Sequence, residues 1–370
     1  MNYKFIFLHE YGEPSHYSGA LAAISKDVTN TVHFFEFSLL KTLLKGLISR
    51  DRVSVIKVFV NFKFLFLTFL FPSRIKNVTL ILGAAPFDWR MLFLVRIIKH
   101  ANVIYHSSWA NWSGEHLPKR NKLFLRFIKA AWKDLFFKTR FFAVVTPMVK
   151  LEINKYMAVP KEKISIVYHS FDESIFYSNI VPLEQKVLES NIKLKVVYVG
   201  RLIEEKGVNE IIELAKMLPD IEFDIIGRGR MEDAVTLASA NITNLVFTGF
   251  VSNRAELAKK FNESDILIQP SKKTDEWQEL FGMAIVEAMA CHVVPVTTLH
   301  SGPKCILEHS GLNKNMCNED HLLAEFYEKL TNYDQQREVL EQDKKMAAEL
   351  AKKYNRSSIA NIWSDIFEKI

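Results

Sequence analysis

The second half of the chain alternates short apolar runs with helical stretches, and this alternation limits the possible folds more than any other feature. The predicted strands are residues 195–199, 221–226, 245–249, 266–269 and 294–297, and the predicted helices between them are 208–218, 231–238, 255–262 and 283–290. Strands that alternate with helices in this way predict a parallel, doubly wound α/β sheet. Such sheets bind ligands at the carboxyl ends of their strands, so residues that follow a strand are the first site candidates.

The first 180 residues show a similar alternation. Predicted strands lie at 4–8, 31–37, 53–60, 78–82, 102–105, 141–145 and 164–167, and predicted helices begin at 19 and span 89–100 and 123–139. A segment at 172–194, which has no core period, separates the two halves, so we predict one domain over 1–180 and a second over 181–354. The last residues, 355–370, are predicted to form a separate amphipathic helix with Ile359, Ile362, Trp363 and Ile366 on one face.

The composition excludes several classes of protein. With 49% hydrophobic and 24% charged residues, the chain is neither disordered nor a disulfide-stabilised miniprotein. Its three cysteines form no CxxC pair, which argues against structural zinc and favours a reducing, cytoplasmic compartment. The most apolar run, 64–71, follows Lys57 and Lys63, so we expect no membrane-spanning helix. Glu10 and Glu13 give the N-terminus an acidic flank that signal peptides lack.

Charge is divided unequally between the two halves. Residues 1–180 hold 25 Lys and Arg against 12 Asp and Glu, and residues 181–370 hold 23 against 30. A basic first half indicates an anionic partner for that half. Its densest basic segment, 119–140, is predicted to be an amphipathic helix with Lys122, Arg126, Lys129 and Lys133 as a stripe. This stripe is either a solvated outer face or a contact with anionic lipid. No nucleic-acid-binding motif is present, so we expect no nucleic-acid partner.

One chemistry-bearing cluster is VGRLIEEKG, directly after the strand at 195–199. Gly200 allows a sharp turn above the sheet, Arg201 stands at the carboxyl end of the strand, and Lys206 precedes a helix. Two cations near a helix N-terminus suit a diphosphate. The alternative is a surface loop in which Arg201 and Lys206 pair with Glu204 and Glu205.

A second cluster, EWQELFGMAIVEAMA, places Glu279 and Glu287 on either side of a predicted loop-to-helix junction. The junction is formed by Phe281, Gly282 and Met283, and the free amides of Gly282 and Met283 at the helix start would face a phosphate. A carboxylate accepts two hydroxyl hydrogen bonds, so Glu279 suits a sugar ring and Glu287 a ribose. The alternative is a pair of solvated glutamates beside a buried helix, one of them favoured by the helix dipole.

The order of these motifs resembles the C-terminal domain of glycosyltransferase family 4, which has the GT-B fold. The similarity runs from about Lys195 to Gly311 and includes IIGRG, VFTGFV, SDILIQPS and the spaced glutamates. It implies that Arg201 and Lys206 bind the donor diphosphate and that Glu279 and Glu287 contact donor sugar and ribose. The family loop beside the nucleobase corresponds to Gly249, Phe250 and Val251.

The resemblance also implies two facing Rossmann-like domains, with the C-terminal helix crossing back to the first. It implies a retaining transfer without an obligatory metal or other cofactor, and the chain contains no D-x-D triplet. In the first domain, Ser18-Gly19 corresponds to a glycine-rich loop near donor and acceptor, or else is a helix cap. His106 corresponds to a histidine near the reacting sugar, or else is structural. The family usually has glycine where His292 stands here.

We therefore predict a hexosyltransferase that moves a sugar from a nucleotide diphosphate sugar to a lipid-linked or surface-polysaccharide acceptor, as in O-antigen or capsule assembly. The basic first domain would bind the acceptor, and the enzyme would be peripheral on the inner face of the cytoplasmic membrane. The alternatives are a soluble glycosyltransferase that makes a small glycoside, a GT-B nucleotide-sugar epimerase, and an inactive binding subunit. Glu10, Glu13, Asp88 and Glu115 are first-domain carboxylates considered by position alone as nucleophiles.

Overall fold

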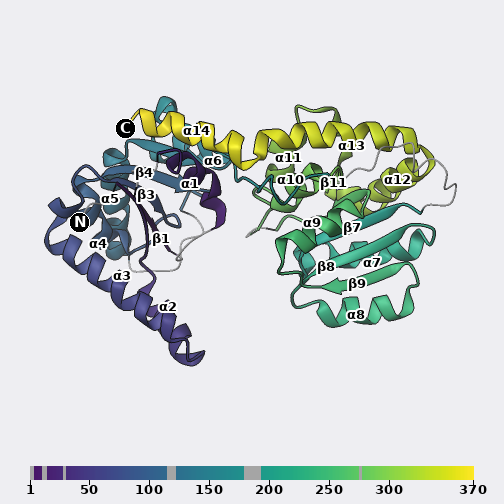
Figure 1. Ribbon diagram of the computed structural model, residues 1–370, viewed down its shortest axis with the longest axis horizontal. Helices are drawn as coiled ribbons and strands as arrows, with labels where there is room; N and C mark the ends of the chain where they lie inside the picture. Colours follow the sequence, from purple (N-terminus) through teal and green to yellow (C-terminus); the bar gives the residue numbers. More distant parts are fainter. Residues whose placement is uncertain (1–3, 11–14, 28–30, 115–121, 179–192, 275–276) are drawn as a thin grey trace. The chain divides into compact units, whose positions relative to one another are not determined.

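The computed structural model describes residues 4–10, 15–27, 31–114, 122–178, 193–274 and 277–370. The chain divides into two compact units. Unit 1 consists of Met1–His169 together with Ile359–Ile370, and unit 2 consists of Ser170–Ser358. Each unit is built on its own parallel sheet of six described strands, so the predicted pair of α/β domains with parallel sheets is confirmed (Figure 1).

The sheet of unit 1 has the strand order β2-β1-β3-β4-β5-β6. Its strands are β1 (Phe5–His9), β2 (Val32–Glu36), β3 (Thr79–Gly83), β4 (Asn102–Ser107), β5 (Phe141–Val144) and β6 (Ile164–Ile166). The α-helices of this half are α1 (Ser18–Ile24), α2 (Leu39–Ile48), α3 (Arg52–Leu70), α4 (Met91–Ile97), α5 (Lys122–Lys138) and α6 (Pro147–Met157). All pairings between neighbouring strands are parallel, which requires helical crossovers.

Two hydrophobic layers cover the sheet of unit 1. Along β1, Ile6 and Leu8 belong to one layer and Phe7 to the other, as the alternation of side chains in a strand requires. The first layer includes buried residues of α3, α4, α5 and α6. The second is formed by α1 and by α14 (Arg356–Glu368), whose Ile359, Trp363 and Ile366 are buried. The predicted apolar face of the last helix therefore packs onto unit 1.

The predicted strand at 53–60 is wrong, because these residues begin the 19-residue helix α3. The β-branched residues of this run favour a strand by propensity. The helix is nevertheless capped by Asp51, whose side chain accepts a hydrogen bond from the Val53 amide. Buried side chains then recur at three- and four-residue intervals, a period visible only across the whole segment. By length and composition alone, α3 is apolar enough to cross a membrane, which we did not anticipate from the sequence; 22% of its most apolar window is buried.

The sheet of unit 2 has the strand order β12-β11-β10-β7-β8-β9. Its strands are β7 (Lys195–Arg201), β8 (Glu222–Arg228), β9 (Leu245–Gly249), β10 (Ile266–Gln269), β11 (Val294–Thr298) and β12 (Met316–Cys317). The helices are α7 (Val208–Met217), α8 (Glu232–Asn241), α9 (Arg254–Asn262), α10 (Met283–Ala290), α11 (Ser301–Leu307), α12 (Leu322–Gln335) and α13 (Arg337–Ala351). Strands β7 to β11 lie close to their predicted positions.

The unit boundaries differ from the predicted division. The structure assigns residues 170–178 to unit 2, whereas we placed the boundary at 180, and residues 179–192 lie outside the described part of the chain. At the other end, residues from Ile359 onward belong to unit 1. His292 has a φ of 60°, in the left-handed region that favours glycine, which accounts for the glycine implied there by the family resemblance.

Candidate active site

The carboxyl ends of β7 and β8 in unit 2 carry two neighbouring arginines. Arg201 ends β7, and Arg228 ends β8 directly opposite it in the parallel register. Both are exposed. The hydroxyl of Tyr198 donates a 2.8 Å hydrogen bond to the Arg201 carbonyl, and a Cβ at Gly200 would lie 2.6 Å from this hydroxyl oxygen. Glycine at 200 thus leaves room for the contact that holds the turn. We did not single out Arg228, although it lies within the quoted IIGRG motif.

The loop after β9 joins this edge through Arg228. Its guanidinium carbon lies 4.2 Å from the ring centroid of Phe250, which is exposed directly after Gly249. Gly249 has a φ of 79°, so the turn here uses a conformation that favours glycine. Phe250 was predicted to lie beside a nucleobase, and the adjacent half-buried residue is Val251. The structure therefore brings this loop together with the arginine edge.

Lys206 and Glu279 form an ion pair that joins the two motif clusters. Lys206 ends a short 3-10 helix (Glu204–Lys206), and its side chain is only 11% exposed. Its Nζ also lies 5.0 Å from the ring centroid of Trp277. The alternative in which Lys206 pairs with Glu204 or Glu205 is therefore wrong. A buried cation with one carboxylate partner is a candidate to bind an incoming diphosphate.

The backbone of Glu279 is fixed on both sides. Its N–H donates to Nδ1 of His300 over 3.0 Å, and its carbonyl accepts from the N–H of Gly302 over 3.0 Å. The other ring nitrogen of His300 lies 2.8 Å from a carboxylate oxygen of Glu319. Burial lowers the pKa of His300, while Glu319 acts in the opposite direction. His300 thus positions the Glu279 main chain, a role that no motif spacing indicated.

The junction before α10 has the predicted backbone. Gly282 is its N-cap with a φ of 95°, and Met283 is the first helical residue, so amides of the first turn are available. The side chain of Phe281 is buried, with its ring centroid 5.9 Å from that of Tyr354. The side chain of Phe281 therefore has a packing role.

Glu287 lies one turn into α10 and is 3% exposed. Its carboxylate forms an ion pair with the guanidinium of Arg254, which also lies 4.6 Å from the ring centroid of Phe176. Burial raises the pKa of Glu287 to about 7, even though Arg254 acts to lower it. The predicted ribose contact is thus a buried carboxylate held by Arg254. We did not predict Arg254, because it lies 33 residues away in another helix.

The raised pKa of Glu287 predicts a pH-dependent stability difference. The folded protein holds this proton up to about pH 7, whereas the ordinary pKa of 4.5 applies to the unfolded chain. This proton therefore adds on the order of 3 kcal/mol to the free energy of unfolding. The contribution is fully present below pH 4.5 and is lost as the pH rises through 7. Relative to Glu287→Gln, which cannot titrate, the wild type should lose stability between pH 5 and pH 8 in urea unfolding.

The matched control is Glu263→Gln, since Glu263 is half exposed on the surface of the same unit. Its stability difference from wild type should not change appreciably over the same pH range. A Glu287→Gln difference that is equally independent of pH would show that Glu287 remains ionised throughout, held by Arg254.

Unit 1 contains a cluster of histidines around His106. The ring centroids of His16 and His106 are 5.2 Å apart and stacked, and those of His16 and His169 are 5.3 Å apart. Burial, with smaller effects from neighbouring histidines, lowers the pKa of His16 to about 3 and that of His106 well below its ordinary value. Burial also lowers the pKa of His169 to about 4. These rings are therefore neutral at pH 7.

The segment around Gly19 packs against the same cluster. Tyr17, the N-cap of α1, lies with its ring centroid 4.9 Å from His106, and its buried hydroxyl oxygen has no hydrogen-bond partner among the described residues. The Tyr17 side chain makes no capping bond, and Ser18 is already helical, so the helix-cap alternative is not supported. Gly19 is buried. His106 and Gly19 thus lie in one cluster of unit 1.

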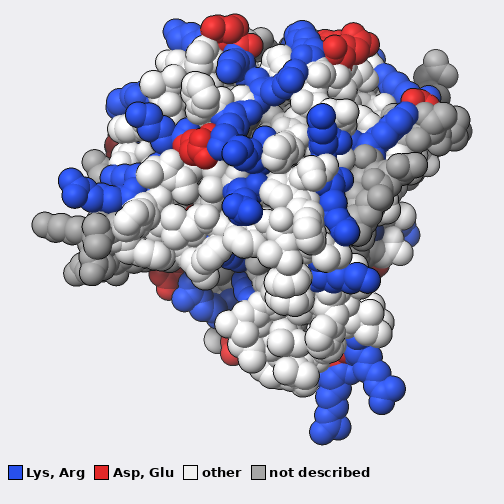
Figure 2. Space-filling model, turned by 90° about the vertical axis from the view of Figure 1, so that its left-hand side faces the viewer, with Lys and Arg blue, Asp and Glu red and all other residues white. Residues whose placement is uncertain are grey.

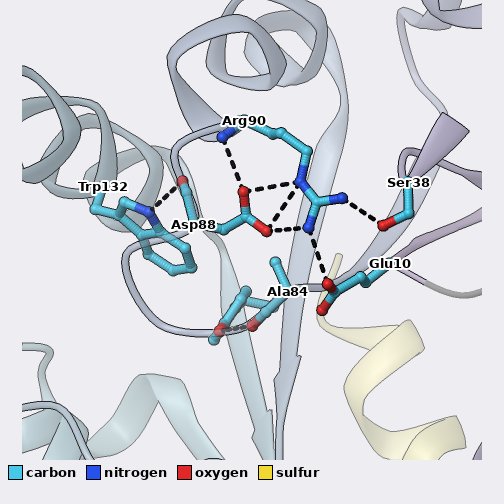
Figure 3. Close-up of polar contacts among 7 residues, drawn as sticks. Glu10, Ser38, Ala84, Asp88, Arg90 and Trp132 are labelled. Carbon is cyan, nitrogen blue, oxygen red and sulfur yellow. Dashed lines mark hydrogen bonds and ion pairs between the residues drawn. The ribbon is translucent and has the colours of Figure 1, made fainter. Parts of the chain in front are cut away.

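Two of the first-domain carboxylates meet at one arginine (Figure 3). The guanidinium of Arg90 donates to Asp88 over 2.9 and 3.0 Å and to Glu10 over 2.9 Å, and it also contacts Ser38. Burial opposes the charge of Arg90, but hydrogen bonds and charges from Asp88 and Glu10 raise its pKa. Both carboxylates are thus ion-paired. Glu13 and Glu115 lie outside the described residues.

The described residues contain no group of three or more His, Cys, Asp or Glu side chains positioned to hold a metal ion. Positive charge at this edge of unit 2 is carried by side chains. It is supplied by Arg201, Arg228 and Lys206.

Comparisons with known proteins agree with this architecture. Residues 182–350 match the family model "Glycosyl transferases group 1". The alpha-galactosylglucosyldiacylglycerol synthase of Streptococcus pneumoniae is 27% identical over 237 residues, or 61% of this chain and 60% of that protein. The amylovoran biosynthesis glycosyltransferase AmsK of Erwinia amylovora is 27% identical over 176 residues, or 45% of this chain and 42% of that protein. The chain thus spans at most 60% of the length of these curated relatives.

Solved structures match over the whole chain. Anabaena HepE in complex with UDP has a TM-score of 0.68 at 16% identity, covering 99% of this chain and all of that one. A glycosyltransferase from Rickettsia africae has a TM-score of 0.67 at 17% identity, with complete coverage of both chains. The chain therefore has the GT-B fold, and its C-terminal unit resembles the glycosyl transferases of group 1.

Proposed function

We propose that the protein is a retaining glycosyltransferase of family 4. It transfers a hexose from a nucleotide diphosphate sugar to a lipid-linked or surface-polysaccharide acceptor, as in O-antigen or capsule assembly. It works without a metal or other cofactor, in the cytoplasm, at the inner face of the cytoplasmic membrane. The observation that carries the proposal is the buried Lys206–Glu279 ion pair, which joins the two motif clusters of unit 2.

The charges of unit 2 suit the departure of a diphosphate. In the proposed step, the bond between sugar C1 and the diphosphate oxygen breaks, and its electron pair stays on the diphosphate. The acceptor hydroxyl oxygen bonds to C1 on the same face, and its proton passes to the departing phosphate. Lys206 and Arg201 stabilise the negative charge as it develops. Glu279 accepts hydrogen bonds from hydroxyls of the sugar.

The membrane acceptor is supported by two observations. One relative carries a diacylglycerol glycolipid in its name, and another is named for amylovoran biosynthesis. In addition, the excess of Lys and Arg in residues 1–180 suits an anionic surface. On α5, Arg126, Lys129 and Lys133 are exposed, while Ile128, Trp132 and Leu135 are buried, so the cationic stripe points outward.

The test is release of nucleoside diphosphate from a panel of nucleotide sugars, with and without a membrane lipid extract. Wild type is compared with Glu279→Ala and Arg201→Ala, and with Lys304→Ala, a half-exposed surface lysine of unit 2, as control. We expect release that requires the extract, fails in the first two variants and persists in the third. Release to water-soluble acceptors alone would contradict the membrane acceptor. A changed sugar recovered on its nucleotide would indicate an epimerase.

A further inference from the structure

Helices α2 and α3 form a hairpin that extends away from the sheet of unit 1 (Figure 1). The turn between them is well defined: Arg50 adopts a left-handed φ of 53°, and the Asp51 amide donates to the Gly46 carbonyl over 2.9 Å. A Cβ at Gly46 would lie 3.1 Å from that of Ser54, so glycine permits close approach of the two helices. The two helices are thus joined by a hydrogen-bonded turn and pack closely against each other.

The outward face of α3 is apolar, which reverses the pattern of a helix on a water-soluble surface. Two of its four buried residues are polar, namely Asn61 and Thr68. Its exposed large side chains are Val53, Ile56, Phe59, Val60, Phe62, Phe66 and Leu70, with Phe59 65% exposed. An exposed apolar face of this extent marks an interaction site.

Helix α2 continues this surface. Leu40, Leu44 and Leu47 are exposed, and Ile48 at its end is 84% exposed. We call the exposed apolar side chains of α2 and α3 together the hairpin face. Exposed lysines lie among these side chains, namely Lys41 and Lys45 on α2 and Lys57 and Lys63 on α3, but the large apolar side chains between them still face water at a cost.

Cations accompany the hairpin face. Between Phe37 and Phe87 the sequence contains eight Lys and Arg and a single acid, Asp51. Asp51 caps α3 and accepts a 2.6 Å hydrogen bond from Ser54. In Figure 2, the part of the surface that projects at the bottom of the view is mostly uncharged, with Lys and Arg at its tip. Apolar side chains among cations complement one partner in particular, a bilayer with anionic headgroups.

We propose that the hairpin face docks unit 1 onto an anionic bilayer. Its Phe and Leu side chains enter the boundary between headgroups and acyl chains, while Lys57 and Lys63 reach lipid phosphates. The proposal rests on the proposed function, which requires an acceptor at the membrane. It assigns the contact to α2 and α3 rather than to the basic stripe of α5 alone.

The packing of α3 favours this interfacial position over a membrane span. Phe64 stacks on Phe35 of β2, with ring centroids 3.6 Å apart. The Glu36 amide donates to Oδ1 of Asn61 over 3.3 Å. One side of α3 is therefore attached to the sheet, and only the other side is available to lipid. Lys57 and Lys63, exposed near the middle of the helix, would also be costly inside a bilayer.

The test is cosedimentation of the full chain with vesicles of phosphatidylglycerol and phosphatidylcholine, compared with phosphatidylcholine alone. We expect binding to the anionic vesicles to fall about tenfold or more in Phe59→Ser/Phe66→Ser and in Lys57→Glu/Lys63→Glu. The matched control is Met217→Ser/Leu237→Ser, which changes two exposed apolar residues of unit 2. All variants are checked for unchanged circular dichroism and for unchanged affinity for nucleoside diphosphates.

Three results would overturn the proposal. These are vesicle binding by both hairpin variants equal to wild type, resistance of the bound protein to alkaline carbonate extraction, and a hairpin-dependent dimer that does not bind vesicles. Failure of the proposed function would look different. In that case no nucleotide sugar would be turned over, with or without lipid, while vesicle binding would still depend on the hairpin face.

Discussion

Replacing Lys206 with alanine is expected to lower kcat/KM for sugar transfer by about 10²- to 10³-fold, the usual cost of removing one preorganised group that stabilises developing charge. Lys206 is the mostly buried cation of the candidate site, and its ammonium is held between Glu279 and the ring of Trp277. Such a charge acts more strongly on a leaving diphosphate than an exposed one, because less water screens it. The measurement is steady-state kinetics with the donor found in the panel.

The pair formed by Lys272 and Glu210 provides the matched control. It lies on the same loop system, with Lys272 Nζ 2.8 Å from a Glu210 oxygen, and it is more exposed than Lys206. Lys272→Ala should keep kcat/KM within about threefold of wild type, as expected for a surface ion pair. Equal losses in Lys206→Ala and Lys272→Ala would mean that the loss reflects disturbance of the loop rather than contact with the diphosphate.

The alternation of strands and helices predicted most of the fold because parallel strands are buried on both faces and so leave clear apolar runs. The segment 53–60 was the exception. Its β-branched residues are typical of a buried strand, yet α3 exposes Val53, Ile56 and Val60. Apolar residues predict burial only where water is the surrounding medium, and a surface that contacts lipid, as proposed for α2 and α3, would give the same pattern as a core. The sequence alone did not distinguish the two.

The candidate site was predictable to the extent that its residues follow strands or start helices. The sequence indicated Lys206 and Glu279 separately. They are 73 residues apart in the chain, and the structure shows that their side chains form an ion pair. Arg254 and His300 were missed for a physical reason. Each acts by a contact across the fold, on the Glu287 carboxylate and on the Glu279 amide, and such contacts leave no regular spacing. Arg228 was missed although it lies only two residues after the predicted strand at 221–226.

In unit 1 the sequence indicated single residues, whereas the structure shows clusters. His106 was selected as a lone histidine at a strand end, but it packs with His16 and His169. Glu10 and Asp88 were considered as nucleophiles by position, but Arg90 binds both. A carboxylate already paired with a guanidinium is a poor nucleophile, because the cation stabilises its charge. Of the four carboxylates considered, the two that the structure describes are therefore both held by Arg90.

Replacing Glu279 with glutamine is expected to change two measurable quantities in opposite directions. Without donor, the Glu279 carboxylate occupies Lys206, so a diphosphate must compete with it for the cation. Glutamine removes this negative charge, while the backbone contacts of residue 279 with His300 and Gly302 do not depend on the side chain. A bare nucleoside diphosphate should therefore bind roughly tenfold more tightly, which corresponds to about 1.4 kcal/mol. Sugar transfer should fall about 10²-fold, because a neutral amide is a weaker acceptor for the sugar hydroxyls.

Calorimetric titration with uridine, guanosine and adenosine diphosphates measures the first quantity, and kinetics with the matching sugar donor measures the second. Glu210→Gln is the control, since Glu210 pairs with Lys272 instead, and it should change neither quantity appreciably. If Glu279 only maintained the loop, its replacement would weaken diphosphate binding and slow transfer together. The opposite signs arise only if the carboxylate competes with the diphosphate for Lys206 in the free protein and binds the sugar during transfer.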